Sequence, residues 1–135
     1  MPSKTTMKRA KEDLRSGKAP TTAAGEFVRE EIEHVRRGEH GARSAKQAIA
    51  IGLSKARRAG VPLTPPRKGQ VKEQTRRSAQ AAYEVGQGER KPRSRSAKRG
   101  KAVERALKRE PRSSASHRAL SRQAKSAAAR RRRRR

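Results

Sequence analysis

The sequence predicts a mostly α-helical protein. A small helical hairpin or three-helix module over about residues 20–86 is expected, flanked by a disordered basic N-terminal arm and a long basic C-terminal tail. Two observations lead to this prediction. Only 15 of the 135 residues are Leu, Ile, Val or Phe, and nine of these lie between positions 27 and 63. The chain also carries 39 Lys and Arg against 12 acids, a net charge of +27, so we expect a packed core only in that window.

Residues 1–19 are predicted to be a disordered basic leader. Leu14 is the one branched apolar residue in this stretch. A helix around residues 8–15 would therefore be transient, because it would have no apolar face to bury against a core.

Residues 20–66 are predicted to form two helices joined by a short loop. Thr21 or Thr22 would cap the first helix and Gly38 would end it. Ser44 would cap the second helix in a capping box, and Gly60 would end it. The apolar positions at helical spacing are Ala24, Val28, Ile32 and Val35 in the first helix, and Ala45, Ile49, Gly52, Leu53 and Ala56 in the second. Prolines at 62, 65 and 66 then set an extended segment.

A third, weakly docked helix is predicted within residues 67–89. It would run from about Val71 to Val85, with Gly86 as its C-cap. Much of its apolar face is Ser, Thr and Ala, so Val71, Tyr83 and Val85 would be its main contributions to a three-helix core.

Residues 90–135 are predicted to be a disordered basic tail. They contain 20 Lys and Arg against only two acids, and they end in six consecutive arginines. Charge of this density opposes compaction of the free chain. The stretches 101–110 and 114–130 are rich in helix-forming residues, so we expect them to become helical when phosphates neutralise their charge.

The charge predicts a nucleic-acid-binding protein, because each cation that meets a phosphate releases condensed counterions. Phe27 and Tyr83 are the only aromatic side chains, too few for the stacking platforms of single-strand binders. Phosphate contact should therefore dominate, with duplex DNA favoured and RNA the alternative. The predicted contact residues are Lys46, Arg57, Arg58, Arg93, Arg95, Lys98, Arg99, Lys101, Arg112, Arg118, Arg122, Lys125, Arg130, Arg131, Arg132, Arg133, Arg134 and Arg135.

Catalysis and membrane insertion are not expected. The chain has no cysteine, which excludes disulfides, thiolate zinc sites and thiol catalysis. Ser44 and Ser54 have no partnered base in a triad-like pattern. No apolar run has the length of a transmembrane or signal segment, so we expect a cytoplasmic protein at the nucleoid.

No metal or cofactor is predicted either. Glu30 and His34 lie four residues apart and are of metal-ligand type. Glu33, however, has the same spacing to Arg29 and Arg37, which favours a salt-bridged solvent face on this helix.

Two segments, 26–34 (EFVREEIEH) and 46–60 (KQAIAIGLSKARRAG), resemble an uncharacterised family of small basic bacterial proteins, a domain of unknown function loosely described as DNA-binding. The resemblance covers about a third of the chain and implies a bacterial source, a recurring helical module and no catalytic residues. The tail separately resembles the Ala/Ser/Lys/Arg tails of linker-histone-type nucleoid proteins.

The favoured function is therefore non-catalytic and histone-like: nucleoid-associated binding of duplex DNA, largely independent of sequence. Two alternatives stay open. One is an RNA-binding accessory protein of ribosomes, whose extended basic tails also thread between phosphates. The other is a protein-interaction or self-associating helical module that the basic tail merely targets.

Overall fold

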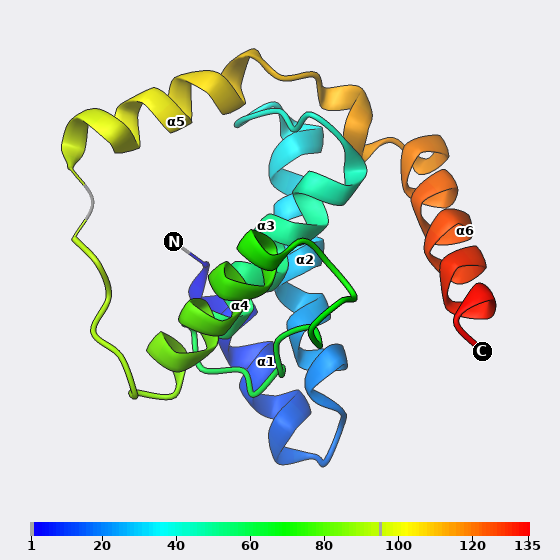
Figure 1. Ribbon diagram of the computed structural model, residues 1–135. Helices are drawn as coiled ribbons and strands as arrows, with labels where there is room; N and C mark the ends of the chain where they lie inside the picture. Colours follow the sequence, from blue (N-terminus) through cyan, green and yellow to red (C-terminus); the bar gives the residue numbers. More distant parts are fainter. Residues whose placement is uncertain (1, 95) are drawn as a thin grey trace. The chain divides into compact units, whose positions relative to one another are not determined.

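The computed structural model describes residues 2–94 and 96–135, and over these residues the chain is helical (Figure 1). The elements, in order, are α1 (Lys4–Arg15), α2 (Pro20–Arg37), α3 (Ala45–Arg58), α4 (Glu73–Gly86), α5 (Ala97–Arg109), a 3-10 helix (Arg112–Ala115) and α6 (His117–Arg133). The β pairing found in these residues is one isolated bridge between Lys68 and Val71. The predicted helical fold class is confirmed.

The chain divides into two compact units, each built from two segments that are distant in sequence. Unit 1 combines Met1–Glu30 with Ala50–Ser94, and unit 2 combines Glu31–Ile49 with Arg95–Arg135. The boundaries fall inside α2 and α3, so each of these helices contributes one end to each unit. The sequence predicted a division into consecutive segments instead.

The N-terminal leader is a helix with a buried face, so its predicted disorder is wrong. Ser3 caps α1, because its hydroxyl oxygen accepts a hydrogen bond from the backbone N–H of Thr6 at 3.1 Å. Ala10 is buried in the core of unit 1, with Met7 and Leu14 packed beside it. The sequence argument counted only branched apolar residues, whereas an alanine and a methionine at helical spacing from Leu14 complete this face.

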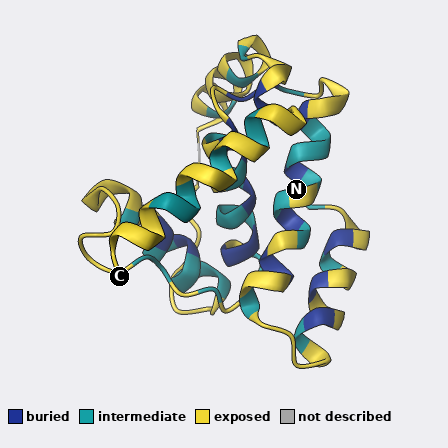
Figure 2. Cartoon of the chain, turned by 90° about the vertical axis from the view of Figure 1, so that its right-hand side faces the viewer, coloured by how far each residue is buried: buried dark blue, intermediate teal, exposed yellow. Residues whose placement is uncertain are grey.

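Phe27 is the largest fully buried side chain of unit 1, at 1% exposure. The buried cluster around it consists of Ala10, Ala23, Ala24, Phe27, Ala56 and Val61. Four of these six residues are alanine, so the helices approach closely. Helices α2 and α3 approach closely at Gly52, where an added Cβ would lie 2.6 Å from the Cα of Val28. Buried and exposed residues alternate along the helices in Figure 2.

Helix α2 ends as predicted and begins slightly earlier. Gly38 has a φ of +80°, its N–H donates to the carbonyl of Val35, and the next N–H, of Glu39, donates to the carbonyl of His34, both at 3.1 Å. This is a Schellman motif, which favours glycine at that position. The helix starts at Pro20, before the predicted threonine caps, because proline at the first helical position loses no hydrogen bond.

Helix α3 has both predicted ends. The hydroxyl oxygen of Ser44 accepts a hydrogen bond from the N–H of Gln47 at 3.2 Å, which confirms the N-cap. Gly60, with a φ of +100°, follows the last turn. The segment that contains the three prolines is not helical, as predicted.

Helix α4 docks in unit 1 through smaller residues than expected. Ala79 and Ala82 are buried, and an added Cβ on Gly86 would lie 1.7 Å from the carbonyl oxygen of Arg57. Val71 is exposed and precedes the helix, so its predicted place in the core is wrong. Small side chains let this helix approach the backbone of α3, where larger ones would hold it away.

The predicted disorder of the tail is also wrong, because α5 and α6 occupy the two stretches expected to be conditionally helical. Ser96 and Ser116 cap these helices through their hydroxyl oxygens. Backbone hydrogen bonds tie the tail into unit 2: Gly41 N–H donates to the carbonyl of Leu107 at 2.8 Å, and Ala42 N–H to that of Pro111 at 3.2 Å. Caps and backbone bonds of this kind offset the repulsion among the cations.

The buried apolar cluster of unit 2 is small and draws on the tail. It consists of Val35, Ala42, Ala48 and Ala115, with Ile32 packed against it. No helix among the described residues combines the length and the apolar character needed to cross a bilayer.

Candidate nucleic-acid interface

Three helices carry rows of exposed Lys and Arg at helical spacing. Positions separated by three, four or seven residues lie on the same face of an α-helix, so each row runs along one side. We call these rows basic ladders. They are Lys4, Lys8, Lys11 and Arg15 on α1; Lys98, Lys101, Arg105 and Arg109 on α5; and Arg118, Arg122, Lys125 and Arg132 on α6.

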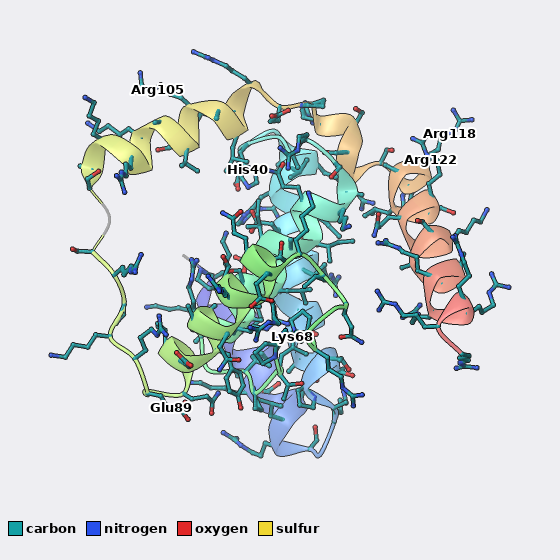
Figure 3. All side chains as sticks on the ribbon, viewed as in Figure 1. His40, Lys68, Glu89, Arg105, Arg118 and Arg122 are labelled. Carbon is teal, nitrogen blue, oxygen red and sulfur yellow. The ribbon has the colours of Figure 1, made fainter. Side chains whose placement is uncertain are left out.

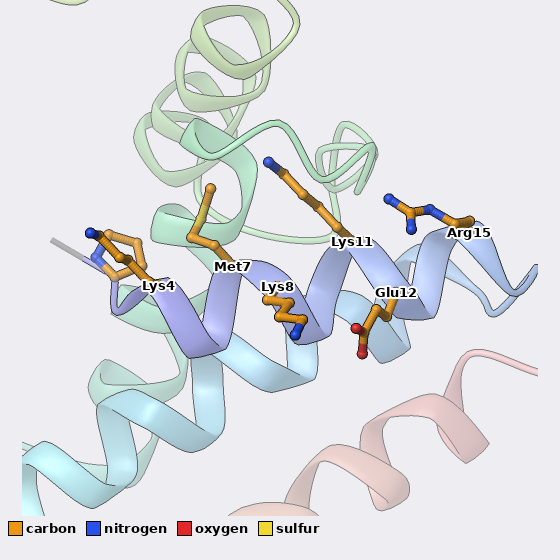
Figure 4. A pocket seen from close by; sticks show the side chains of 7 residues that line it. Lys4, Met7, Lys8, Lys11, Glu12 and Arg15 are labelled. Atoms are coloured by element: carbon orange, nitrogen blue, oxygen red, sulfur yellow. The ribbon is translucent and has the colours of Figure 1, made fainter.

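The ladder of α1 is directed outward by the burial of the opposite face. Thr6, Ala10 and Asp13 on that face are buried in unit 1. The four cations border an open hollow together with Met7 and Glu12 (Figure 4). Because the helix is fixed from behind, its cations form a row on a rigid support.

The ladder of α5 lies opposite the apolar positions Val103 and Leu107 of the same helix. Arg105, in the middle of the row, is labelled in Figure 3. Glu104 forms an ion pair with Lys108 at 3.2 Å, at positions outside the ladder. The four ladder cations are all exposed.

The ladder of α6 extends along most of the helix. Figure 3 shows Arg118 and Arg122 on the same side of it. From Arg118 to Arg132 the row spans about 21 Å at the helical rise per residue. Leu120 and Ala127, on other faces, are half-buried. The last turn is entirely arginine, and cations at a helix C-terminus interact favourably with the helix dipole.

The predicted contact residues fall into four groups. Those in the ladders are Lys98, Lys101, Arg118, Arg122, Lys125 and Arg132. Those exposed elsewhere are Lys46, Arg58, Arg93, Arg99, Arg112, Arg130, Arg131, Arg133, Arg134 and Arg135. Arg57 is buried, and Arg95 lies outside the described residues.

Arg57 has a structural role in unit 1. It is 8% exposed, its Nε donates to the carbonyl of Leu63 at 3.1 Å, and its Nη2 donates to that of Thr64 at 3.3 Å. Desolvation by burial lowers the pKa of this guanidinium. The side chain holds the extended proline-containing segment against α3, so it is not presented to a phosphate.

Arg112 is exposed but already uses part of its donor capacity. Its Nη2 donates to the carbonyl of Arg36 in the last turn of α2, and the Nε of Arg36 donates to the carbonyl of Ala115 at 2.8 Å. These bonds join the 3-10 helix to the end of α2 within unit 2.

Sequence reasoning missed six ladder residues, Lys4, Lys8, Lys11, Arg15, Arg105 and Arg109. The signal was present, because basic residues recur every three or four positions in residues 4–15 and 98–109. It was not used for the leader, since that segment was treated as disordered and a disordered chain has no faces.

The aromatic side chains do not form a stacking surface. Phe27 is fully buried, and Tyr83 is half-buried on α4. With no exposed pair of rings in the described residues, bases of a single strand have no platform on which to stack.

Comparison with known proteins links one part of the chain to a family. No curated protein and no solved structure gave a match. The family match covers residues 21–69, which contain α2 except its first residue, all of α3 and the extended segment, and which leave all three basic ladders outside. The α2–α3 region of this chain is therefore similar to DUF6496, a family of unknown function.

Proposed function

We propose that this protein binds nucleic acid, most favourably duplex DNA, through phosphate contacts made by the three basic ladders and without catalysis. The observation that carries the proposal is that each ladder places four exposed cations along one face of a helix. Cations three or four positions apart in such a row have Cβ atoms about 5–6 Å apart, and Lys125 and Arg132, seven positions apart, are separated by about 10 Å along the helix axis. Duplex DNA presents one phosphate charge per about 1.7 Å of its axis, so a ladder can meet several phosphates at once.

Two further features support binding that is largely independent of sequence. Phosphate contacts position a protein on a duplex but carry no base information. The ladders of α5 and α6 have few acids near them in sequence: Glu104 and Glu110 are the two in α5, α6 and the segment that joins them, whereas α1 also carries Glu12 and Asp13. We therefore include a nucleoid-associated, histone-like role in the proposal.

Duplex DNA is favoured over single strands, because stacking on aromatic side chains is the main device of single-strand binders. The buried position of Phe27 removes one of only two candidates. Helical RNA also presents ordered phosphates, so a direct competition must separate it from DNA.

The decisive measurement is the salt dependence of duplex binding by the full-length protein. The variant Arg118→Gln/Arg122→Gln/Lys125→Gln removes three charges from the α6 ladder while keeping good helix formers. If all three cations contact phosphates, the slope of log K against log salt should flatten by about 2.7, at about 0.9 per contact.

A matched control removes three exposed cations outside the ladders, in Lys68→Gln/Lys72→Gln/Arg77→Gln. This variant has the same net charge as the ladder variant, so a general effect of charge would change both slopes equally. We expect its slope to stay within about one unit of the unaltered protein. Equal flattening in both variants would remove the α6 ladder from the interface.

Competition between duplex DNA and ribosomal RNA then separates the partners. Preferential displacement of labelled DNA by unlabelled RNA would replace this proposal with an RNA-binding accessory role. Failure to bind either polymer at low salt would favour a protein-interaction module.

A further inference from the structure

Three potential metal ligands come together at the end of α2 and in the loop that follows, all within unit 2. Glu31, His34 and His40 each offer one ligand atom, and these atoms all lie within 4.8 Å of one another. Nε2 of His40 is 2.7 Å from Oε1 of Glu31, and Nδ1 of His34 is 3.9 Å from Oε2 of the same carboxylate. The pair considered from the sequence is not the one that forms, because Glu30 Oε1 accepts a hydrogen bond from Ser3 N–H.

The local backbone explains why these side chains meet. Glu31 and His34 are three residues apart on α2 and therefore lie on one face. The Schellman motif at Gly38 ends the helix and turns the chain back. His40 then reaches the same carboxylate from the loop. The two imidazole rings are 6.3 Å apart between centroids, in an edge-to-face arrangement.

The cluster is sheltered on one side and open on the other. The side chain of Glu31 is 1% exposed, whereas those of His34 and His40 are 21% and 17% exposed. A partly buried carboxylate with two imidazoles at the surface excludes most water from one side of an ion and leaves a path from solvent.

Each imidazole also has an acceptor at its outer nitrogen. Nδ1 of His40 is 2.8 Å from the carbonyl oxygen of Gly41. Nε2 of His34 is 3.5 Å from Oε2 of Glu39. In metal sites, an acceptor in this position holds the ring hydrogen outward and directs the other nitrogen's lone pair to the metal.

The contact between His40 and Glu31 needs a proton or a metal ion between its two atoms. Both ring nitrogens of His40 face oxygen acceptors, and a neutral imidazole donates from only one of them. If the hydrogen is on the nitrogen that faces Gly41, a lone pair faces the carboxylate at 2.7 Å. Either one further proton shared between the two side chains or a metal ion satisfies that arrangement, and titration with a metal ion distinguishes the two.

We propose that Glu31, His34 and His40 bind one divalent transition-metal ion, with Zn²⁺ the ion that suits the donor set best. Two imidazoles and one carboxylate form a known zinc ligand set, with a fourth position left for water. With metal–ligand bonds of about 2.0–2.1 Å, tetrahedral ligand atoms lie about 3.3 Å apart. The shortest contact here would open slightly and the longer ones would close.

The charge of the chain strengthens this inference. At +27, the protein repels a dication overall, so general accumulation of cations on its surface is disfavoured. Saturable uptake would therefore report coordination. The ion would join the last turns of α2 to the following loop and would stabilise unit 2 by an amount that grows with the logarithm of the ion's concentration relative to its Kd.

The test is calorimetric titration of the full-length protein with Zn²⁺, beside His34→Gln, His40→Gln and His117→Gln. His117 is the third histidine of the chain and begins α6, outside the cluster, so it is a matched control. We expect one ion per chain. Loss of a residue that only hydrogen-bonds a metal ligand weakens metal binding at least about tenfold. Loss of a ligand should cost more, so His34→Gln and His40→Gln should each weaken binding more than about tenfold, and His117→Gln should leave it unchanged.

A second readout keeps the proposal testable if a variant folds poorly. Co²⁺ added to the unaltered protein should give visible ligand-field bands that Zn²⁺ abolishes, and Zn²⁺ should raise the melting temperature of the unaltered protein and of His117→Gln. The proposal is overturned if the unaltered protein shows no saturable binding and no such bands. It is equally overturned if His117→Gln loses as much affinity as His40→Gln, because surface histidines would then account for the uptake.

Discussion

Unit 1 and unit 2 are held together by different kinds of contact. Unit 1 buries Phe27, with half-buried leucines around its alanine-rich cluster. Among the described residues of unit 2, the largest buried apolar side chain is Val35, and the carboxylate of Glu31 is buried as well. Apolar burial stabilises in proportion to area, so unit 2 gains less from it. Hydrogen bonds that join distant segments, such as Gly41 to Leu107, must contribute a larger share.

The strongest test of this difference between the units is to truncate the largest buried apolar side chain of each. We expect Phe27→Ala to lower the free energy of unfolding by about 3–5 kcal/mol, and Val35→Ala by about 2 kcal/mol. Urea denaturation followed by circular dichroism measures both losses. Hydrogen exchange should localise the first loss to α1, α3 and α4. Equal losses would show that unit 2 depends on apolar burial as much as unit 1 does.

Two glycines at close backbone contacts, with two others as controls, test whether such contacts matter equally in both units. An added Cβ would lie 1.7 Å from a backbone oxygen at Gly86 in unit 1 and also at Gly41 in unit 2. Alanine at either position should destabilise by about 1–3 kcal/mol, because a neighbouring backbone must move. Gly25 in unit 1 and Gly100 in unit 2 are helical, and beyond their own helix an added Cβ at either would meet no atom within 4 Å. Alanine there should stabilise by about 0.5–1 kcal/mol.

Thermal and urea unfolding of the four alanine variants gives the comparison directly. A destabilising Gly86→Ala beside a neutral Gly41→Ala would show that the loop of unit 2 yields easily. In that case the backbone hydrogen bonds of unit 2 contribute less to its stability than we infer from the small size of its apolar cluster.

Two arginines should separate stability from binding. Arg57→Met leaves the carbonyls of Leu63 and Thr64 without their donor, which should cost about 1–3 kcal/mol of stability and leave DNA affinity unchanged. Arg122→Met, on the exposed ladder of α6, should weaken DNA binding and leave stability within about 0.5 kcal/mol. Fluorescence anisotropy and denaturation of the same samples test both expectations. A loss of affinity in folded Arg57→Met would return that residue to the interface.

The smallest expected effect is a pH dependence of α4 in unit 1. A hydrogen bond from Arg76 lowers the pKa of Glu73, and one from Gln80 lowers the pKa of Glu84. Because both pKa values are lower in the folded state, the stabilisation is fully present above the ordinary glutamate pKa of about 4.3 and is lost as the pH falls below it. Melting temperatures at pH 7 and pH 3 should differ less in Glu73→Gln than in the unaltered protein. An identical difference would contradict this.

Helix ends, which depend on neighbouring residues, were predictable from the sequence, and contacts between distant segments were not. Gly38, Ser44 and Gly60 act through their own turns, so spacing alone located the ends of two helices. The face of α1 and the contact of Ala115 in unit 2 depend on alanine, which is common on exposed and buried helix faces alike. An alanine-based core therefore gives no periodic signal that a count of branched residues can detect.

The candidate sites show the same contrast between local and long-range features. The composition of the tail predicted a basic surface, but its arrangement into ladders required knowing that the leader and tail are helices. Arg57 looks like any other basic residue of α3 in sequence, and only the position of the proline-containing segment shows that it is buried. His40 was missed beside Glu31, because the two meet only after the helix ends and the chain turns back.

The sharing of α2 and α3 between the units has a consequence for how the chain can be divided. Val35, Ala42 and Ala48 lie within the family-matched residues 21–69, whereas Ala115, which covers them, lies far outside. A protein fragment cut to the matched region would keep both helices and lose part of the cover at each end. Domains that follow one another along a chain can be cut out and studied separately, but this chain cannot be divided in that way. Removing the N-terminal or the C-terminal segment exposes a buried face of α2 or α3, and the fragment that remains still contains that helix.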